Sequence, residues 1–567
     1  MKQDELSLAE METLIQRGET LTVEFKGDWE GHNHGLNGLP DRDLVAAVVA
    51  LANTKGGYLF LGVEDNGEIT GLRPKHQDLT GMAAMIANKT NPALNVSIFP
   101  YHLQNNMIAV IAVESSRQLI STSDGLLLKR RLKVDNKPEA VPFYPHEFIS
   151  RQSSLGLMDP SSMTFPEIPI SQLDPLQRIR LRQAIKLYHG DSALLDLADE
   201  ELDGALQLIA EKNGEWHPTV TGLLLLGTEK LLRQYLPAYE VAFQVLEGTE
   251  VRVNEFFHLP LLETFEAIEQ HMKKWIVEKE MEFGLFRIPV PNYDQRAFRE
   301  AFVNALVHRD FSILGFVQVK LDDTGLLISS PGGFMDGVTL NNLLVTPPRS
   351  RNPQLADTIK RIGLAERTGR GIDRIYEGML RYGRPAPDYS LSSDFNVSVF
   401  LVNSAPDLNF MQMLLEHEKD GKVLPIDSLL ILSELREMRR LPCSDLAAVV
   451  QKPERAVHAE LEKLLECGIL ERQGAGRGSS YTLSAKLYAQ AGKKTEYIRQ
   501  KGFSIIQQEH MIEQFIEAHG KIVRGDVMKM CYLSGRQAYY VLQKMVSAGK
   551  ILKHGGKIDA FYTRATT

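Results

Sequence analysis

The sequence contains only three cysteines in 567 residues, Cys443, Cys467 and Cys531. They are too few and too scattered for a disulfide framework or a four-thiolate zinc site, which fits a reducing compartment. A long apolar run is also missing. The N-terminal stretch MKQDELSLAEMETLIQRGE is polar and acidic, and no uninterrupted apolar span is long enough to cross a bilayer. We therefore expect a cytoplasmic protein that has no membrane partner.

Two motifs of nucleotide-using enzymes are absent as well. No Gly-Lys-Ser/Thr follows a glycine run, so there is no Walker-type P-loop and motor-helicase activity is not expected. HRD at 308–310 is like a kinase catalytic loop, but neither a downstream DFG nor an upstream glycine-rich strand accompanies it. The chain also has no low-complexity tract and no short internal repeat.

The composition that remains is that of an ordinary globular protein, with 43% hydrophobic and 24% charged residues. A chain of 567 residues is too long for one hydrophobic core, which predicts several domains. The formal net charge is −8, yet residues 491–567 contain 13 Lys and Arg against 6 Asp and Glu. We expect a polyanionic partner to meet that end of the chain.

The first 155 residues alternate between helical and strand patterns, which indicates an α+β unit. DRDLVAAVVALANTKGG at 41–57 begins with Asp and ends at two glycines, as a buried helix does. In TLTVEFK at 20–26, period-two alternation puts Glu24 and Lys26 on one face of a strand. Further strands are predicted over residues 58–63, 106–114 and 126–134.

Three carboxylates flank two of these strands. Glu19 precedes TLTVEFK, Glu24 lies within it, and Asp65 follows the strand at 58–63. Carboxylates that two strands bring together suit Mg²⁺ or Mn²⁺, and such an ion readies water for attack on a phosphodiester. Lys26 would then stabilise developing phosphate charge. An ordinary exposed polar face is the alternative interpretation.

GETLTVEFKGDW and LVAAVVALANTKGGYLFLGVEDNGEITGL resemble the Schlafen AlbA-type domain, a nucleic-acid-binding module, over about residues 12–150. The resemblance implies a metal-dependent RNA-cleaving centre with Glu19, Glu24 and Asp65 as metal ligands. Schlafen nucleases pair two such lobes and carry a zinc site, whereas this chain has one lobe and no candidate zinc ligands. A second protomer would then supply the other lobe, and nucleic-acid binding without cleavage remains open.

Four basic residues lie close together on the predicted strand at 126–134. Basic side chains on a strand can contact phosphates and position a polyanion without reading its sequence. A solvated charged face is the alternative. The residues are Lys129, Arg130, Arg131 and Lys133.

A second region, 156–289, is predicted to be a helical connector that leads by strands into the next unit. Its pattern is helical from about 171 to 214, and 220–227 and 238–248 are predicted strands. Residues 290–405 then contain a helix over YDQRAFREAFVNALVHR, a hairpin over FVQVKLDDTGLLISS and a closing strand over NVSVFLVN.

Glu300 and Asn304 lie four apart on the predicted helix, so they share one face. Such a pair can serve an ATP site, in which Glu orients water and Asn holds Mg²⁺. Glycines follow at SSPGGF, with Gly332, and at ERTGRGIDRI, with Gly369 and Gly371. Backbone N–H groups that glycine leaves free at a helix start cradle phosphate.

In this order, the motifs over residues 290–400 resemble the GHKL ATPase fold, in the divergent form of a RecG-like helicase C-terminal region. The usual adenine-recognising aspartate is replaced by Ser329-Ser330-Pro331-Gly332. Nucleotide binding without hydrolysis and a retained fold with an inactive pocket both remain open. The resemblance implies an ATP site formed by Glu300, Asn304, Gly369 and Gly371, with Arg349 and Arg351 as phosphate partners.

The last 165 residues resemble two winged-helix domains, each with a helix-turn-helix and a glycine-tipped hairpin. Glu454, Glu460, Glu462 and Glu466 on the first recognition helix would repel phosphates, so we expect that helix to contact protein. The second recognition helix carries Tyr539 and Tyr540, for which core packing is the alternative role. Basic residues that favour DNA binding surround them, namely Arg536, Lys544, Lys550, Lys553 and Lys557.

The sequence thus predicts a multidomain α+β protein that binds ATP with Mg²⁺ or Mn²⁺, binds DNA or RNA, and forms a homo-oligomer. One hypothesis is a metal-dependent nuclease, for example in phage defence, that the ATP site controls. The other is a nucleotide-responsive transcription regulator that cuts nothing. The expected domains are a Schlafen AlbA-type domain at 1–155, the connector at 156–289, a GHKL-like α/β sandwich at 290–405, and winged helices at 406–490 and 491–567.

Overall fold

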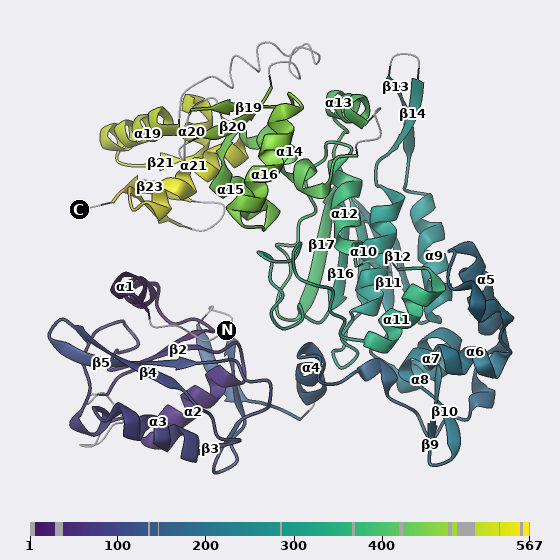
Figure 1. Ribbon diagram of the computed structural model, residues 1–567, viewed down its shortest axis with the longest axis horizontal. Helices are drawn as coiled ribbons and strands as arrows, with labels where there is room; N and C mark the ends of the chain where they lie inside the picture. Colours follow the sequence, from purple (N-terminus) through teal and green to yellow (C-terminus); the bar gives the residue numbers. More distant parts are fainter. Residues whose placement is uncertain are drawn as a thin grey trace. The chain divides into compact units, whose positions relative to one another are not determined.

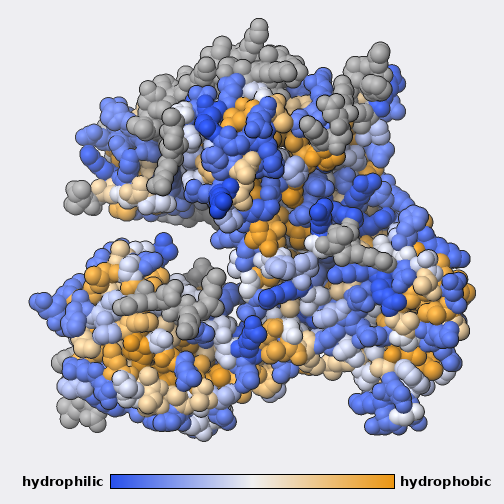
Figure 2. All heavy atoms as spheres, viewed as in Figure 1, coloured by the Kyte–Doolittle hydropathy of each residue, from blue (hydrophilic) through white to orange (hydrophobic). Residues whose placement is uncertain are grey.

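The computed structural model (Figure 1) forms two compact units, Met1–Leu155 and Gly156–Thr567. None of its described helices is long and apolar enough to cross a membrane. The faces visible in Figure 2 mix hydrophilic and hydrophobic side chains over both units. The structure describes residues 6–28, 38–133, 137–145, 147–283, 286–365, 369–418, 423–474, 479–484, 505–531, 533–555 and 560–565.

Unit 1 is built on a four-stranded sheet in the order β1-β2-β5-β4, in which only β1 and β2 are parallel. Alternation along β2 sends Leu59 and Leu61 to one face, against α2 and α3, and Phe60 to the other face, where Met11 of α1 packs. The sheet is therefore covered by helices on both sides. Its strands are β1 (Val23–Lys26), β2 (Gly57–Leu61), β4 (Ser97–Leu103) and β5 (Asn106–Val113); the helices are α1 (Leu8–Arg17), α2 (Asp41–Ala52) and α3 (Leu79–Asn88).

Shorter elements complete unit 1. β7 pairs with β8 in a separate antiparallel ribbon, and the carbonyls of Ile120 and Leu128 accept hydrogen bonds from the side chain of Asn53, just after α2. This amide fixes the ribbon to the end of the helix. The elements are β3 (Thr90–Asn91), β6 (Ser121–Thr122), β7 (Leu128–Leu132), β8 (Pro138–Pro142) and α4 (Glu147–Ser154).

Unit 2 begins with a helical region, in which one predicted strand is wrong. The predicted strand at 220–227 is instead a helix, α7, followed by its C-cap Gly227; the hydroxyl of Thr219 caps its first turn. All seven residues of α7 are buried, and a short buried helix and a buried strand have the same apolar run. The region contains α5 (Pro175–Leu187), α6 (Asp199–Ala205), β9 (Ile209–Lys212), β10 (Glu215–Pro218), α7 (Val220–Leu226) and α8 (Glu229–Tyr235).

A five-stranded sheet in the order β12-β11-β15-β16-β17 follows, and only its β11–β15 pair is parallel. Phe265, Phe298 and Phe302 from two of its helices stack in the core with ring centroids 5.9 Å apart. The strands are β11 (Val241–Glu247), β12 (Glu250–Phe257), β15 (Val317–Asp322), β16 (Gly325–Pro331) and β17 (Asn396–Val402), and β13 (Glu278–Phe283) and β14 (Phe286–Pro291) form a separate hairpin; the helices are α9 (Leu261–Lys273), α10 (Gln295–Val307), α11 (Pro353–Ile362) and α12 (Gly371–Leu380).

Two small domains of one topology end the chain. Each has three helices and a three-stranded sheet whose last strand lies in the middle, β18-β20-β19 and β21-β23-β22, which is the winged-helix arrangement. The first contains α14 (Ile426–Met438), β18 (Arg440–Pro442), α15 (Cys443–Val450), α16 (Glu454–Glu466), β19 (Leu470–Gln473) and β20 (Ser480–Leu483), after α13 (Leu408–Glu418). The second contains α19 (Ile505–His519), β21 (Ile522–Val523), α20 (Arg524–Cys531), α21 (Gly535–Ser547), β22 (Ile551–His554) and β23 (Phe561–Arg564).

Candidate functional site

A cavity of about 270 Å³ in unit 2 gathers the residues of the predicted nucleotide site. Its walls come from α10, the glycine turn after β16, the segment between that turn and α11, and the start of α12. Ile328, Val397 and Val399 of β16 and β17 line it from the sheet. All seven residues predicted to bind the cofactor line this one cavity, namely Glu300, Asn304, Gly332, Arg349, Arg351, Gly369 and Gly371.

Glu300 and Asn304 share a face of α10, as their spacing predicts, and their side chains are hydrogen-bonded. The carboxylate of Asp294 caps the helix by accepting the N–H groups of Arg296 and Ala297. Glu300 is only 5% exposed. Burial raises its pKa, and this outweighs the opposing effects of Arg374 and of the Asn304 hydrogen bond. The pair therefore presents two oxygen-bearing side chains in a site of low polarity.

The glycines of the cavity are required by close approaches. A Cβ on Gly371 would lie 2.1 Å from Oε1 of Glu300, so the carboxylate lies directly against the first turn of α12. The N-cap residue of that helix, Arg370, makes no side-chain cap hydrogen bond, and a carboxylate there complements the helix dipole. Gly369 has a φ of +78°, and a Cβ on it would lie 2.5 Å from Cγ of Pro348.

The two arginines of the cavity have different environments. Arg351 is 3% exposed, and its guanidinium binds the carboxylate of Asp310 at 3.0 Å and the carbonyl of Gly333 at 3.0 Å. It holds the glycine turn against the segment after α10, so its prediction as a phosphate partner is not supported. Arg349 is exposed at the rim, where it donates to the carbonyl of Asp336 at 3.3 Å.

His308 is a cavity residue that the sequence reasoning missed. It follows Asn304 by four residues, so the helical spacing that paired Glu300 with Asn304 extends to it. Burial, followed by the nearby charges of Arg351 and Lys360, lowers the pKa of His308 to about 4. The imidazole is therefore neutral at neutral pH.

The other end of the cavity is apolar and aromatic. Tyr389 stacks on Tyr376 with ring centroids 6.4 Å apart, and burial raises the pKa of Tyr389. Ser330, which stands in the stretch that replaces the usual aspartate, donates its hydroxyl to the carbonyl of Ala305 at 2.6 Å. Its hydroxyl is thus used within the fold. Phe334, Met335 and Leu343 complete this wall.

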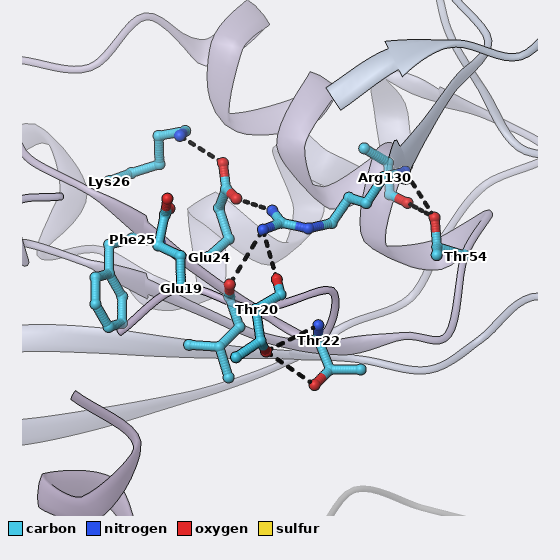
Figure 3. A network of polar contacts seen from close by, with 10 residues as sticks. Glu19, Thr20, Thr22, Glu24, Phe25, Lys26, Thr54 and Arg130 are labelled. Carbon is cyan, nitrogen blue, oxygen red and sulfur yellow. Dashed lines mark hydrogen bonds and ion pairs between the residues drawn. The ribbon is translucent and has the colours of Figure 1, made fainter. Parts of the chain in front are cut away.

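In unit 1, Glu24 and Lys26 share a face of β1, but that face is covered (Figure 3). Glu24 is 8% exposed and pairs with Lys26 at 2.5 Å and with the guanidinium of Arg130. Arg130 also donates to the carbonyls of Thr20 at 2.7 Å and Val23 at 3.1 Å. Two cations therefore neutralise the Glu24 carboxylate.

The three predicted metal ligands do not form a metal site. Glu19 accepts the backbone N–H of Phe25 at 2.9 Å, and Asp65 lies in an exposed turn. The acid beside the end of β1 is Glu64, because a Cβ on Gly27 would lie 2.2 Å from its Oε2. Among the residues that the structure describes, no three His, Cys, Asp or Glu side chains are grouped to hold a metal ion.

The basic strand of unit 1 is also paired with acids. Arg130 is 4% exposed, so its prediction as a phosphate contact is wrong: it is the internal partner of Glu24. Lys129 pairs with Glu147. Arg131 and Lys133 are exposed and share Glu139, at 2.8 and 3.7 Å. Only these last two face solvent.

The second winged helix has an exposed basic surface. Arg536 and Lys544 of α21 and Lys553 of β22 are exposed, as is Tyr539, whereas Tyr540 is half-buried. Lys557 lies outside the described residues. In the first winged helix, two of the acids of α16 form ion pairs: Glu460 pairs with Lys463, and Glu462 pairs with Arg472.

Family comparisons identify three segments of the chain. The family described as "Schlafen, AlbA_2" matches residues 19–138, and a domain of unknown function, DUF8451, matches residues 148–242. The family described as "Putative ATP-dependent DNA helicase recG C-terminal" matches residues 315–401, which run from just before β15 to β17. Glu300 and Asn304 precede that match.

A comparison with curated proteins gave no match. Among solved structures, the DIP2311 protein of Corynebacterium diphtheriae is 20% identical, with 98% of this chain and 99% of that chain covered and a TM-score of 0.48. The N-terminal domain of a RecG-related protein of Nitrosomonas europaea is 22% identical, with 24% and 94% covered and a TM-score of 0.17. From its family matches, the chain joins a Schlafen AlbA_2 domain to a domain of the RecG C-terminal type, as its motifs predict.

Proposed function

We propose that this protein binds ATP in the cavity of unit 2 and binds nucleic acid, as a nucleotide-responsive regulator. The observation that carries the proposal is that six predicted nucleotide-binding residues line one cavity together with Arg351, whose guanidinium is used within the fold. The two family descriptions add support, since one names an ATP-dependent DNA helicase. Self-association and a role in transcription or phage defence remain predictions.

The donors around α10 fit a nucleotide with Mg²⁺ or Mn²⁺. Glu300 and Asn304 offer the oxygen atoms that a hard divalent cation prefers. The start of α12, where the N-cap residue Arg370 makes no side-chain cap hydrogen bond, offers N–H groups suited to phosphate. The cation would neutralise phosphate charge. Glu300 would orient water or the cation, Asn304 would ligate the cation, and Arg349 at the rim would contact phosphate. The apolar wall with Tyr389 would hold the base.

Nucleotide titration tests the cavity. We expect ATP with Mg²⁺ to bind the full chain in a calorimetric titration, and Asn304→Ala to weaken it at least ten-fold because the cation loses a ligand. Asn254→Ala, on β12 away from the cavity lining, is the matched control, because among the described residues its side-chain amide bonds that of Gln244, at 2.9 Å. Equal ATP affinity for Asn304→Ala and wild type would contradict the assignment.

Cleavage assays separate the regulator from the nuclease. Because Lys26 and Arg130 neutralise Glu24 and no carboxylate cluster forms among the described residues, we expect bound RNA and single-stranded DNA to remain intact with Mg²⁺ or Mn²⁺. Nucleic-acid binding is measured in parallel, so that intact substrate reflects lack of cleavage and not lack of binding. If the wild type cuts the nucleic acid and Glu24→Gln abolishes the cleavage, the nuclease hypothesis replaces the regulator hypothesis.

A further inference from the structure

The recognition helix of the second winged helix, α21, is in contact with the first winged helix. Arg536 pairs with Glu434 of α14 at 2.9 Å, and the side-chain amide of Gln537 donates to the carbonyl of Glu437. The hydroxyl of Tyr540 donates to Asp445 of α15. Arg536 and Tyr540 are four apart on α21 and share one side of the helix. The half-buried Tyr540 ring also packs against the domain's own core, which contains Ala538, Val541, Leu542 and Met545.

That face is the one a winged helix presents to DNA. The outer, N-terminal part of the second helix of a helix-turn-helix contacts base edges in the major groove. Here it meets the acids Glu434 and Asp445, which take the place that phosphates and bases would take. Lys544 and Tyr539 remain exposed beside it. Full engagement of α21 with a duplex therefore requires these contacts to break.

Helix α15, which supplies Asp445 to the contact with α21, is also attached to the nucleotide cavity. Gln451 caps the C-terminus of α15 with a φ of +59°, and its side chain bridges two backbone groups of the segment 337–349, which we call the cavity loop. It accepts the N–H of Leu344 at 2.9 Å and donates to the carbonyl of Leu340 at 2.7 Å. Val338, Leu343 and Leu344 of this loop line the cavity. The eight-residue helix α15 thus touches the cavity loop at one end and α21 at the other.

The size of the cavity indicates which way the coupling runs. Ligand pockets usually measure about 300–1,000 Å³, and this cavity measures about 270 Å³. The cavity thus lies at the small end of that range, so a nucleotide that fills it would press on the lining. The sheet, α10 and the apolar side of α15 belong to the packed core, whereas Leu343 and Leu344 of the cavity loop are only partly buried against that core. The loop is therefore the part of the lining that a ligand can displace most easily.

We propose that nucleotide binding displaces the cavity loop, shifts α15 through Gln451, and frees the reading face of α21 for duplex DNA. The inference rests on the proposed nucleotide site and adds its regulation. The partner that gains access is a DNA duplex, whose phosphates compete with Glu434 and Asp445. By linkage, DNA raises nucleotide affinity by the factor by which nucleotide raises DNA affinity.

The test measures both affinities on the full chain at one salt concentration. Anisotropy of a fluorescent duplex is titrated with and without ATP and Mg²⁺, and ATP binding is titrated with and without duplex. We expect ATP to tighten duplex binding about five-fold or more. In the absence of DNA, amide hydrogen exchange in α21 (Gly535–Ser547) should also rise when ATP binds.

Two variants test the coupling, one at the contact of α15 with the cavity loop and one at its contact with α21. Gln451→Gly removes the bridge but keeps the left-handed cap, which glycine favours; duplex affinity should then no longer respond to ATP. Its control is Gln207→Gly, which changes an exposed glutamine that also has a positive φ, 56°, and which should respond as wild type does. Tyr540→Phe loses the bond to Asp445 and should tighten duplex binding without ATP, whereas Tyr539→Phe should not.

The outcomes separate the two proposals. If ATP does not bind, the proposed function fails and the coupling fails with it. If ATP binds but leaves duplex affinity within two-fold and α21 exchange unchanged, the coupling alone is overturned. A Gln451→Gly variant that binds ATP and still responds like wild type would also overturn it.

Discussion

At the scale of single residues, the His308 imidazole predicts how stability depends on pH. In the folded protein its pKa is about 4, whereas the ordinary value is 6.5. As pH falls through 6.5, His308 is protonated in the unfolded chain, whereas in the folded chain it is protonated only near pH 4. Stability is therefore lost across that window. We expect a loss on the order of 2 kcal/mol, less than the full shift implies because the ring is partly exposed.

The measurement is a urea midpoint for unit 2 between pH 7 and pH 4. His308→Gln should flatten the curve over this range, whereas His510→Gln, which alters an exposed histidine on α19, should leave its slope unchanged. An unaltered slope in His308→Gln would mean that other groups cause the pH dependence.

A second residue-scale prediction concerns Arg130. Arg130→Ala removes the buried partner of Glu24 and two hydrogen bonds to carbonyls of the β1 region. The buried Glu24 carboxylate would then keep the partly exposed Lys26 as its counter-charge but lose its buried partner, so unit 1 should lose about 3 kcal/mol of unfolding free energy. Arg131→Ala breaks an exposed pair with Glu139 and should cost less than about 1 kcal/mol. Equal effects in calorimetry would contradict this account.

The same residues show how far sequence predicts a site. Strand alternation correctly put Glu24 and Lys26 on one face, and helical spacing correctly stacked Glu300 on Asn304. The prediction of a metal site was wrong because Arg130, 106 positions after Glu24, supplies the counter-charge of the Glu24 carboxylate. No local sequence pattern reveals a partner so distant in sequence. For the same reason the structural role of Arg351, whose guanidinium binds the carboxylate of Asp310, was not predictable.

At the scale of elements, helix α7 contains a glycine with no room for a side chain. A Cβ on Gly222 would lie 1.9 Å from the carbonyl oxygen of Leu208. Gly222→Ala should therefore destabilise unit 2 by about 3 kcal/mol, because a backbone group must move. Gly204→Ala in α6 meets nothing within 4 Å and should stabilise by about 0.5–1 kcal/mol through helix propensity. Equal urea midpoints for the two variants would disprove the close packing.

The α7 segment also shows where element prediction stops. Its apolar run fits a buried strand or a buried helix, and the Thr219 hydroxyl cap that marks the helix start is a short-range signal within that ambiguity. Long periodic segments such as α2 and α10 were predictable because their apolar spacing extends over several turns. The two winged helices were predictable from the order of helix, turn, helix and hairpin.

At the scale of the whole molecule, the two units predict two calorimetric transitions. Unit 1 and unit 2 each have their own cores, and the proposed nucleotide site lies wholly in unit 2. ATP at 100 times its dissociation constant should stabilise unit 2 by about 2.7 kcal/mol and leave the unit 1 transition in place. A shift of both transitions together would show that the units unfold as one.

The bond from Arg130 to β1 also has a consequence during synthesis. The Glu24 carboxylate leaves the ribosome more than a hundred residues before the guanidinium of Arg130. The charge on β1 of the nascent chain therefore stays unbalanced by Arg130 until β7 has been synthesised. A truncation product that stops before this strand would carry a half-neutralised acid beneath its first sheet. Such fragments should be prominent substrates for proteases and chaperones, whereas a chain released just beyond β8 already has the partner that β1 needs.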